Sequence, residues 1–332
     1  MAHADYFERL EAFATQLRPD AALLDGSVAA VAVWYDRFQQ EELNLGGSVR
    51  MPFDGLGFCR ALETLAMASG TFAFVALQQF VANMNVGDRF QDPLWPKVGV
   101  AFGHLGSQGR DLPQRRDGKV NGFAPWFTGA GIFDWVVLGI DGEEQEEIFV
   151  LTEAHDRPEF AHSEPISLMA CTGASTVGVH VKNLFVSDDA ILKVTPPGAK
   201  ARSDAGSVLY QTPLLVGCVR ACWEIIVTSP RVDTDQKAAC GQYTKALLDR
   251  AHTAFANGDM RDGPALRAEL GDYAVRIARL AAMATGGGGL RMSHPVQRLY
   301  REALVYSLMA QTDLIINQAF SMVINGPETV PG

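Results

Sequence analysis

Trp126 and Thr128 are the two residues whose types and spacing point most directly to chemistry. They lie two positions apart just before the apolar run at residues 135–138, and a run of this kind bounded by Gly and Asp is typical of a β-strand. In an extended segment, residues two apart point to the same face. That face would offer a flat aromatic wall and a hydroxyl, which suit a planar heteroaromatic ring with polar edges, such as a flavin. The alternative is an ordinary half-buried strand that contains a Trp and a Thr.

A second stretch has the composition of an anion-binding loop. Its consecutive glycines leave the backbone N–H groups unobstructed by side chains, so the loop can form a nest for a phosphate. These residues are Gly286, Gly287, Gly288 and Gly289. Four glycines also make a plain flexible linker. Arg298 and Arg301 follow in a run that favours structural salt bridges on a helix.

The two stretches resemble the acyl-CoA dehydrogenase family. Residues 121–134 are similar to the family's flavin-contacting segment, in which a Trp-x-Thr pair lies against the isoalloxazine ring near its reactive N5. Residues 286–303 are similar to its C-terminal signature, a Gly-Gly-x-Gly loop followed by Pro-Val-x-Arg-Leu-Tyr-Arg-Asp-Ala, with Glu302 in place of the Asp. In the family, the glycine loop approaches the FAD pyrophosphate from a neighbouring subunit. The resemblance implies that Trp126, Thr128 and residues 286–289 hold FAD, with FMN or no flavin as the alternatives.

The sequence departs from this family at the general base. The resemblance places a Glu where this chain has Ala310, and its alternative position falls at Ser207. Because a general base is typically worth about 10² to 10⁴ in rate, we expect no standard β-oxidation dehydrogenase. Asp313, three residues past Ala310, is one weak catalytic candidate, and a solvated or capping role is its alternative. His104 is the other, in the segment that replaces the family's Thr-Glu-Pro loop beside the flavin.

The segment that helps the family to hold its dinucleotide also differs. Its Arg-x-x-Phe-Gly pattern corresponds to residues 230–235, where Asp235 would repel a phosphate. Arg231 could compensate, so we count it among the cofactor-binding candidates.

The elements that must position these residues follow a helix–strand–helix order. Apolar residues recur at spacings of three and four, which predicts helices, over residues 5–18, 28–45, 56–68, 72–84, 213–228, 237–257, 264–285 and 295–325. Short strands are expected at residues 135–140, 148–152 and 177–181. We infer an α+β, acyl-CoA-dehydrogenase-like fold with an N-terminal helical domain (1–95), a small middle β-domain (96–197) and a C-terminal helical domain (198–332).

Composition narrows the classes of function. The net charge of −10 argues against a nucleic-acid binder, and no apolar run approaches the roughly 18 residues of a membrane span. The first residues lack the basic and apolar regions of a secretory signal. The five cysteines have no CxxC spacing and no neighbouring His cluster, so we expect buried free thiols, no metal site and a cytoplasmic protein.

The resemblance implies a flavin-dependent oxidoreductase that acts on a small-molecule or acyl-thioester substrate outside β-oxidation. A flavin-dependent monooxygenase is one alternative. A redox-inactive homologue is another, which would bind a ligand or partner an active paralogue. The apolar residues 214–226 and the long last helix predict a homodimer or homotetramer, because a lone domain would struggle to cover them.

Overall fold

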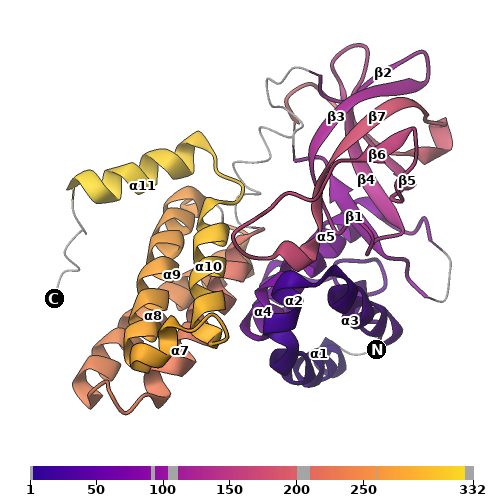
Figure 1. Cartoon of the computed structure of the whole chain (residues 1–332). Coiled ribbons are helices and arrows are strands. Elements are labelled where there is room, and N and C mark those ends of the chain that lie inside the picture. Colours follow the sequence, from indigo (N-terminus) through magenta and orange to yellow (C-terminus); the bar gives the residue numbers. More distant parts are fainter. Residues whose placement is uncertain (1–2, 91–93, 104–110, 200–209, 260, 326–332) are drawn as a thin grey trace. The chain divides into compact units, whose positions relative to one another are not determined.

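The computed structural model describes residues 3–90, 94–103, 111–199, 210–259 and 261–325. Helices occupy the N- and C-terminal parts of the chain and strands occupy the middle (Figure 1), which confirms the predicted α+β class. The chain forms two compact units, Met1–Phe53 with Thr71–Asp204 and Asp54–Gly70 with Ala205–Gly332. The division into three domains stays an interpretation of the sequence.

Aromatic packing forms the helical core of the first unit. Phe13, Phe38 and Phe72 are fully buried, and their ring centroids lie 5.2 to 5.5 Å apart. The side chain of Ser27 accepts a hydrogen bond from the N–H of Ala30 and so caps the start of one helix. The helices are α1 (His3–Leu17), α2 (Ala21–Gly26), α3 (Val28–Gln40) and α5 (Gly70–Val86).

The described strands of the first unit form one sheet in the order β6-β7-β3-β2-β4-β5-β8, with β1 paired to β4. The pairings of β4 with β1 and β2 are parallel, and the others are antiparallel. The strands expected at residues 135–140 and 148–152 are present as β4 and β5, which form an antiparallel hairpin. The strands are β1 (Val98–Ala101), β2 (Gln114–Arg116), β3 (Lys119–Thr128), β4 (Trp135–Asp141), β5 (Glu147–Glu153), β6 (Phe160–His162), β7 (Thr176–Phe185) and β8 (Ile191–Thr195).

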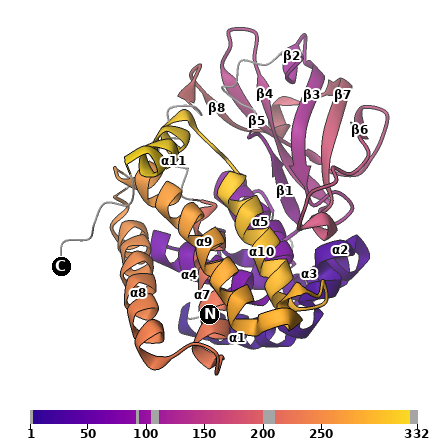
Figure 2. The same ribbon diagram turned by 60° about the vertical axis from the view of Figure 1, so that its left-hand side comes forward.

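The second unit is a helical bundle that includes one helix from the N-terminal part of the sequence. In Figure 2, α9 lies between α8 and α10. A Cβ added to Gly217 would lie 2.6 Å from the carbonyl oxygen of Glu63, so this glycine permits the close approach of α7 to α4. The helices are α4 (Gly55–Ala68), α7 (Thr212–Thr228), α8 (Thr234–Asn257), α9 (Gly263–Thr285), α10 (Pro295–Leu308) and α11 (Asp313–Asn325).

Helix α7 is covered within its own unit. Leu214, Leu215, Val216, Val219 and Ile226 are all buried there. The expectation that a lone domain could not cover these five side chains is therefore wrong, because they are buried within a single chain.

The predicted continuous helix over residues 295–325 is also wrong, because the chain breaks between Leu308 and Asp313. Ala310 adopts a positive φ of 48°, and the hydroxyl of Thr312 accepts a hydrogen bond from the N–H of Ile315 at 3.4 Å. A left-handed residue followed by a Thr cap ends one helix and starts another.

A buried ion pair stabilises α10. Nη1 of Arg298 lies 2.7 Å from both carboxylate oxygens of Glu302, and both side chains are buried. This pair confirms the salt-bridge interpretation for Arg298.

Among the helices that the structure describes, none is long and apolar enough to cross a membrane.

Candidate functional site

Trp126 lies at an irregularity near the end of β3. Ala124 pairs with Val179 and Phe127 pairs with Val177, so three residues of β3 advance against two of β7. Such a bulge redirects a side chain, and Pro125 suits it because proline has no N–H to donate to the ladder. Trp126 is 54% exposed, so its indole ring is an accessible aromatic surface on the first unit.

Thr128 lies two residues further on and is buried. Its hydroxyl faces that of Thr176, its register partner on β7, with the two Oγ1 atoms 3.0 Å apart. When one hydroxyl donates to the other, the second retains a proton for a further acceptor. The end of β3 therefore combines an exposed aromatic ring with a hydroxyl pair that has one proton to donate.

The turn that follows holds the hydroxyl pair in place. The N–H of Gly129 donates to the carbonyl of Ala174 at 2.8 Å, and a Cβ on Gly129 would lie 2.2 Å from the ring of Phe133. Cys171 and Ser175, in the segment just before β7, have positive φ angles of 62° and 49°. Backbone strain of this kind concentrates at binding sites, and here it lies beside the end of β3 and the start of β7, where Thr128 and Thr176 pair.

His162 is a residue near the bulge that sequence reasoning missed. Its ring centroid lies 5.7 Å from that of Phe127, and its backbone pairs with Val179. Burial lowers its pKa, so the imidazole is neutral at pH 7. His162 packs on the fully buried Phe127. It could not be found from the sequence because its strand, β6, has only 3 residues, too few to give a recognisable spacing.

In the second unit, Arg231 lies against the start of the glycine segment. Gly286 has a φ of 66°, and a Cβ there would lie 2.9 Å from Cζ of Arg231. The hydroxyl of Ser229 accepts from the N–H of Arg231 at 3.1 Å and donates to the carbonyl of Ala284 at 2.8 Å. These bonds fix the backbone of Arg231 beside the end of α9, so a guanidinium and the glycine backbone are brought together.

The glycine segment forms a short 3-10 helix, η5 (Gly286–Leu290). Gly289 is buried, and a Cβ there would lie 2.1 Å from Oγ1 of Thr285. Gly287 and Gly288 are exposed, and a Cβ on either would have no neighbour within 4 Å. The backbone is thus open at two of the four positions, while the predicted anion nest stays a prediction.

Of the two catalytic candidates, His104 lies outside the described residues, as does Ser207. Asp313 is exposed in the first turn of α11, where the helix dipole favours a carboxylate. Ala310 occupies the break between α10 and α11 and carries no proton-accepting group. Trp126 and Thr128 belong to one unit, and Arg231 and the glycines belong to the other.

No protein-family model matches the sequence, and none of the curated proteins matches it. Solved structures do match. The structure of KijD3 in complex with FMN and dTDP-3-amino-2,3,6-trideoxy-4-keto-3-methyl-D-glucose is 15% identical, with a TM-score of 0.78 over 97% of this chain and 94% of that one. A nitrososynthase from Micromonospora carbonacea var. africana is 16% identical, with a TM-score of 0.78 over 98% and 97%.

Butyryl-CoA dehydrogenase from Megasphaera elsdenii is 16% identical, with a TM-score of 0.72 over 97% of this chain and 98% of that one. The coverage is nearly complete in both directions for all three structures. The chain therefore has the acyl-CoA dehydrogenase fold, as the two sequence stretches predicted. At this level of identity, the likeness concerns the fold alone.

Proposed function

We propose that this chain is a flavin-dependent oxidoreductase that acts on a small or carrier-bound substrate. The observation that carries the proposal is the exposed Trp126 at the β3 bulge beside the Thr128–Thr176 hydroxyl pair. An aromatic ring that can stack and a hydroxyl proton two residues away suit the flat ring and polar edge of a flavin. The FMN complex of KijD3, with its nucleotide-sugar ligand, supports the same class of cofactor and a carrier-bound substrate.

The form of the flavin depends on Arg231. Its guanidinium lies beside Gly286 and, within the described residues, has no carboxylate partner. A cation near the exposed residues Gly287 and Gly288 suits a diphosphate, which supports FAD. FMN is the alternative, because its single phosphate needs fewer contacts.

Ala310 argues against the dehydrogenation of saturated acyl thioesters. That reaction requires a base for the proton next to the thioester carbonyl, and Ala310 stands where the family resemblance places it. A monooxygenase does not need this base, and a nitrososynthase shares the fold. A flavin-dependent monooxygenase is therefore our second candidate.

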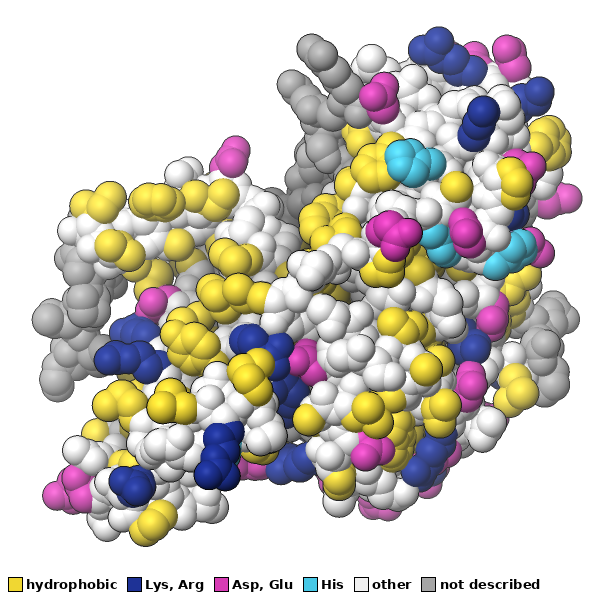
Figure 3. All heavy atoms as spheres, in the orientation of Figure 1, with side chains coloured by type: hydrophobic (Ala, Val, Ile, Leu, Met, Phe, Trp, Pro, Cys, Tyr) yellow, Lys and Arg dark blue, Asp and Glu magenta, His cyan; other side chains and the backbone are white. Residues whose placement is uncertain are grey.

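Helix α11 supports a homodimer or homotetramer. Its exposed large apolar side chains include Leu314, Phe320, Val323 and Ile324, and Figure 3 shows hydrophobic side chains along this helix. An apolar face of this kind marks an interaction surface, and a second copy of the chain is the occupant that we propose.

The first experiment asks whether the purified chain binds flavin. An absorbance spectrum, followed by extraction and chromatography, identifies a retained flavin, and fluorescence titration with FMN and FAD measures the affinity. We expect one flavin per chain. Failure to bind either form would contradict the proposal and favour the redox-inactive homologue or the partner of an active paralogue.

The second experiment measures dye reduction with short- and long-chain acyl-CoAs. We expect negligible activity for the unaltered chain and some activity after Ala310→Glu, because the substitution restores a carboxylate. Robust activity without the substitution would contradict the assignment, and its loss in Asp313→Asn would identify Asp313 as the base. Ala310→Gln is the matched control, since it adds similar bulk without the acid.

A further inference from the structure

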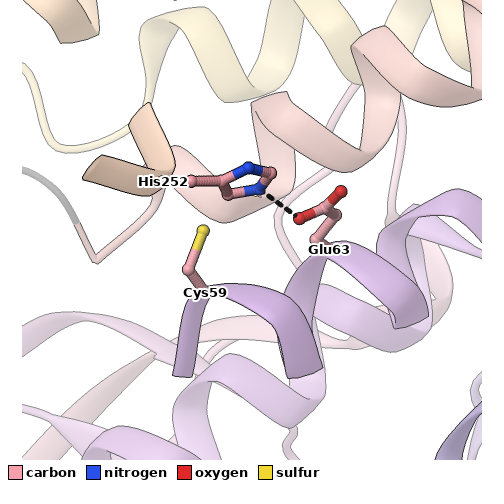
Figure 4. A group of neighbouring side chains, drawn as sticks. All are labelled: Cys59, Glu63 and His252. Atoms are coloured by element: carbon pink, nitrogen blue, oxygen red, sulfur yellow. Dashed lines mark hydrogen bonds and ion pairs between the residues drawn. The ribbon is translucent and has the colours of Figure 1, made fainter. Parts of the chain in front are cut away.

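A carboxylate buried in the second unit has partners from two other helices. Glu63 lies on α4 and is 2% exposed, and Arg220 of α7 donates from Nη1 to its Oε1. Nε2 of His252, on α8, lies 2.8 Å from its Oε2. Cys59 precedes Glu63 by one helical turn and is fully buried. One ligand atom from each of Cys59, Glu63 and His252 lies within 4.8 Å of the other two (Figure 4).

The backbone sets this arrangement. A Cβ on Gly55 would lie 2.3 Å from the carbonyl oxygen of Phe255, so α4 and α8 are in direct backbone contact there. Cys59 lies one turn further along α4, and His252 lies about one turn back along α8, so their side chains meet beside this contact. The positions of the three side chains therefore follow from helix packing and not from a flexible loop.

We propose that Cys59, Glu63 and His252 bind a thiophilic divalent cation of the Zn²⁺ type. Thiolate, imidazole and carboxylate are the groups that bind zinc in proteins, whereas Mg²⁺ and Ca²⁺ take oxygen ligands. Three protein ligands leave a fourth position for water. The His252 side chain is 30% exposed, which provides a path from solvent to a cluster that is otherwise buried.

The metal requires only small movements. With Zn–S at about 2.3 Å and Zn–N at about 2.0–2.1 Å, the ligand atoms of a tetrahedral site lie roughly 3.5 Å apart. The Cys59 sulfur would therefore approach the other two ligand atoms by up to about 1 Å. The Glu63–His252 pair, now 2.8 Å apart, would open by roughly 0.7 Å, and side-chain rotation can supply both movements. The thiol of Cys59 releases its proton to solvent as the cation enters.

Arg220 competes with the cation for Glu63. Its side chain is 47% exposed, so it can turn towards solvent when a metal occupies the carboxylate. The competing interpretation is a purely structural ion-pair network that holds α4 against α7 and α8. The two interpretations differ in the expected effect of removing Arg220. At a metal site, loss of this positive charge raises the affinity of Glu63 for the metal. In a structural network, the same loss removes an ion pair and lowers the free energy of unfolding.

The test titrates the full chain, purified without a polyhistidine tag or chelator, with Co²⁺ and then Zn²⁺. We expect one Co²⁺ per chain with a thiolate-to-cobalt charge-transfer band, which Cys59→Ser removes. Loss of a residue that only supports a metal ligand typically weakens metal binding by about 10–100-fold. His252→Gln should weaken Zn²⁺ binding by more than this, because it removes a ligand itself. Cys240→Ser, on the same helix as His252, and His155→Gln, in the other unit, are matched controls that should change neither result.

Arg220→Gln is expected to tighten Zn²⁺ binding. Absence of one-to-one binding, or a cobalt spectrum that Cys59→Ser leaves unchanged, would overturn the proposal. Circular dichroism checks the folding of each variant. If Cys59→Ser does not fold, the test uses His252→Gln and Arg220→Gln, because both side chains are partly exposed. Weaker or unchanged Zn²⁺ binding in Arg220→Gln then counts against the site. None of these measurements depends on flavin.

Discussion

Removal of the Trp126 ring should weaken flavin binding by an amount that its exposure sets. A Trp side chain presents up to about 250 Å², so at 54% exposure roughly 130 Å² is accessible, and a stacked ring covers one face, roughly 65 Å². At about 25 cal/mol per Å², this burial contributes about 1.6 kcal/mol. Ring stacking adds about 0.5–1.5 kcal/mol. The total of about 2–3 kcal/mol corresponds to a Kd raised about 30- to 150-fold in Trp126→Ala.

The assay is fluorescence titration of the flavin-free chain with FMN or FAD. Phe185→Ala is the matched control, because Phe185 is 70% exposed at the opposite end of the β3–β7 pair. Thermal unfolding should be nearly unchanged in both variants, since surface substitutions usually shift stability by about 0.5 kcal/mol or less. Equal flavin affinity in the two variants would refute the stacking geometry.

Three further predictions concern the second unit. Arg231→Leu should weaken FAD binding and leave FMN binding nearly unchanged, because only FAD has a diphosphate for the guanidinium; equal losses in parallel titrations would count against this. Glu302→Ala should lower the free energy of unfolding by about 3–5 kcal/mol in urea, because it leaves Arg298 buried and unpaired. Arg298→Met with Glu302→Leu should recover most of that loss, and a harmless single variant would contradict the reasoning. Phe320→Asp with Val323→Asp should convert the oligomer to a monomer by light scattering, whereas an unaltered chain that is already monomeric would contradict the α11 interface.

The sequence predicted those parts of the fold that depend on local pattern. Apolar periodicity predicted the helix at residues 213–228, which is α7, and the pattern of residues 177–181 predicted a strand, which is part of β7. The break at Ala310 was missed because an apolar pattern continues past it, although Thr312 followed by Asp313 is a recognisable start of a helix. Periodicity also gave no warning of the bulge beside Trp126, where Pro125 was the available signal.

Contacts between distant segments could not be predicted in this way. His252 follows Glu63 by 189 residues, and only the packing of α8 on α4 brings them together. The sequence predicts free thiols because no His cluster neighbours a cysteine along the chain, whereas Cys59 and His252 come together only in the folded structure. Trp126 and Thr128 could be identified because both lie on one strand.

Helix α4 is synthesised long before the other helices of its unit. The helix is made early, but the backbone carbonyl of Phe255 and the side chain of His252 that pack against it come from α8. At about 5–20 residues per second, the 189 residues between Glu63 and His252 take roughly 10–40 s to translate. During that time the apolar side of α4 has no native partner from α8, so we expect the nascent chain to expose an apolar surface, of the kind that chaperones bind, which the finished protein has covered.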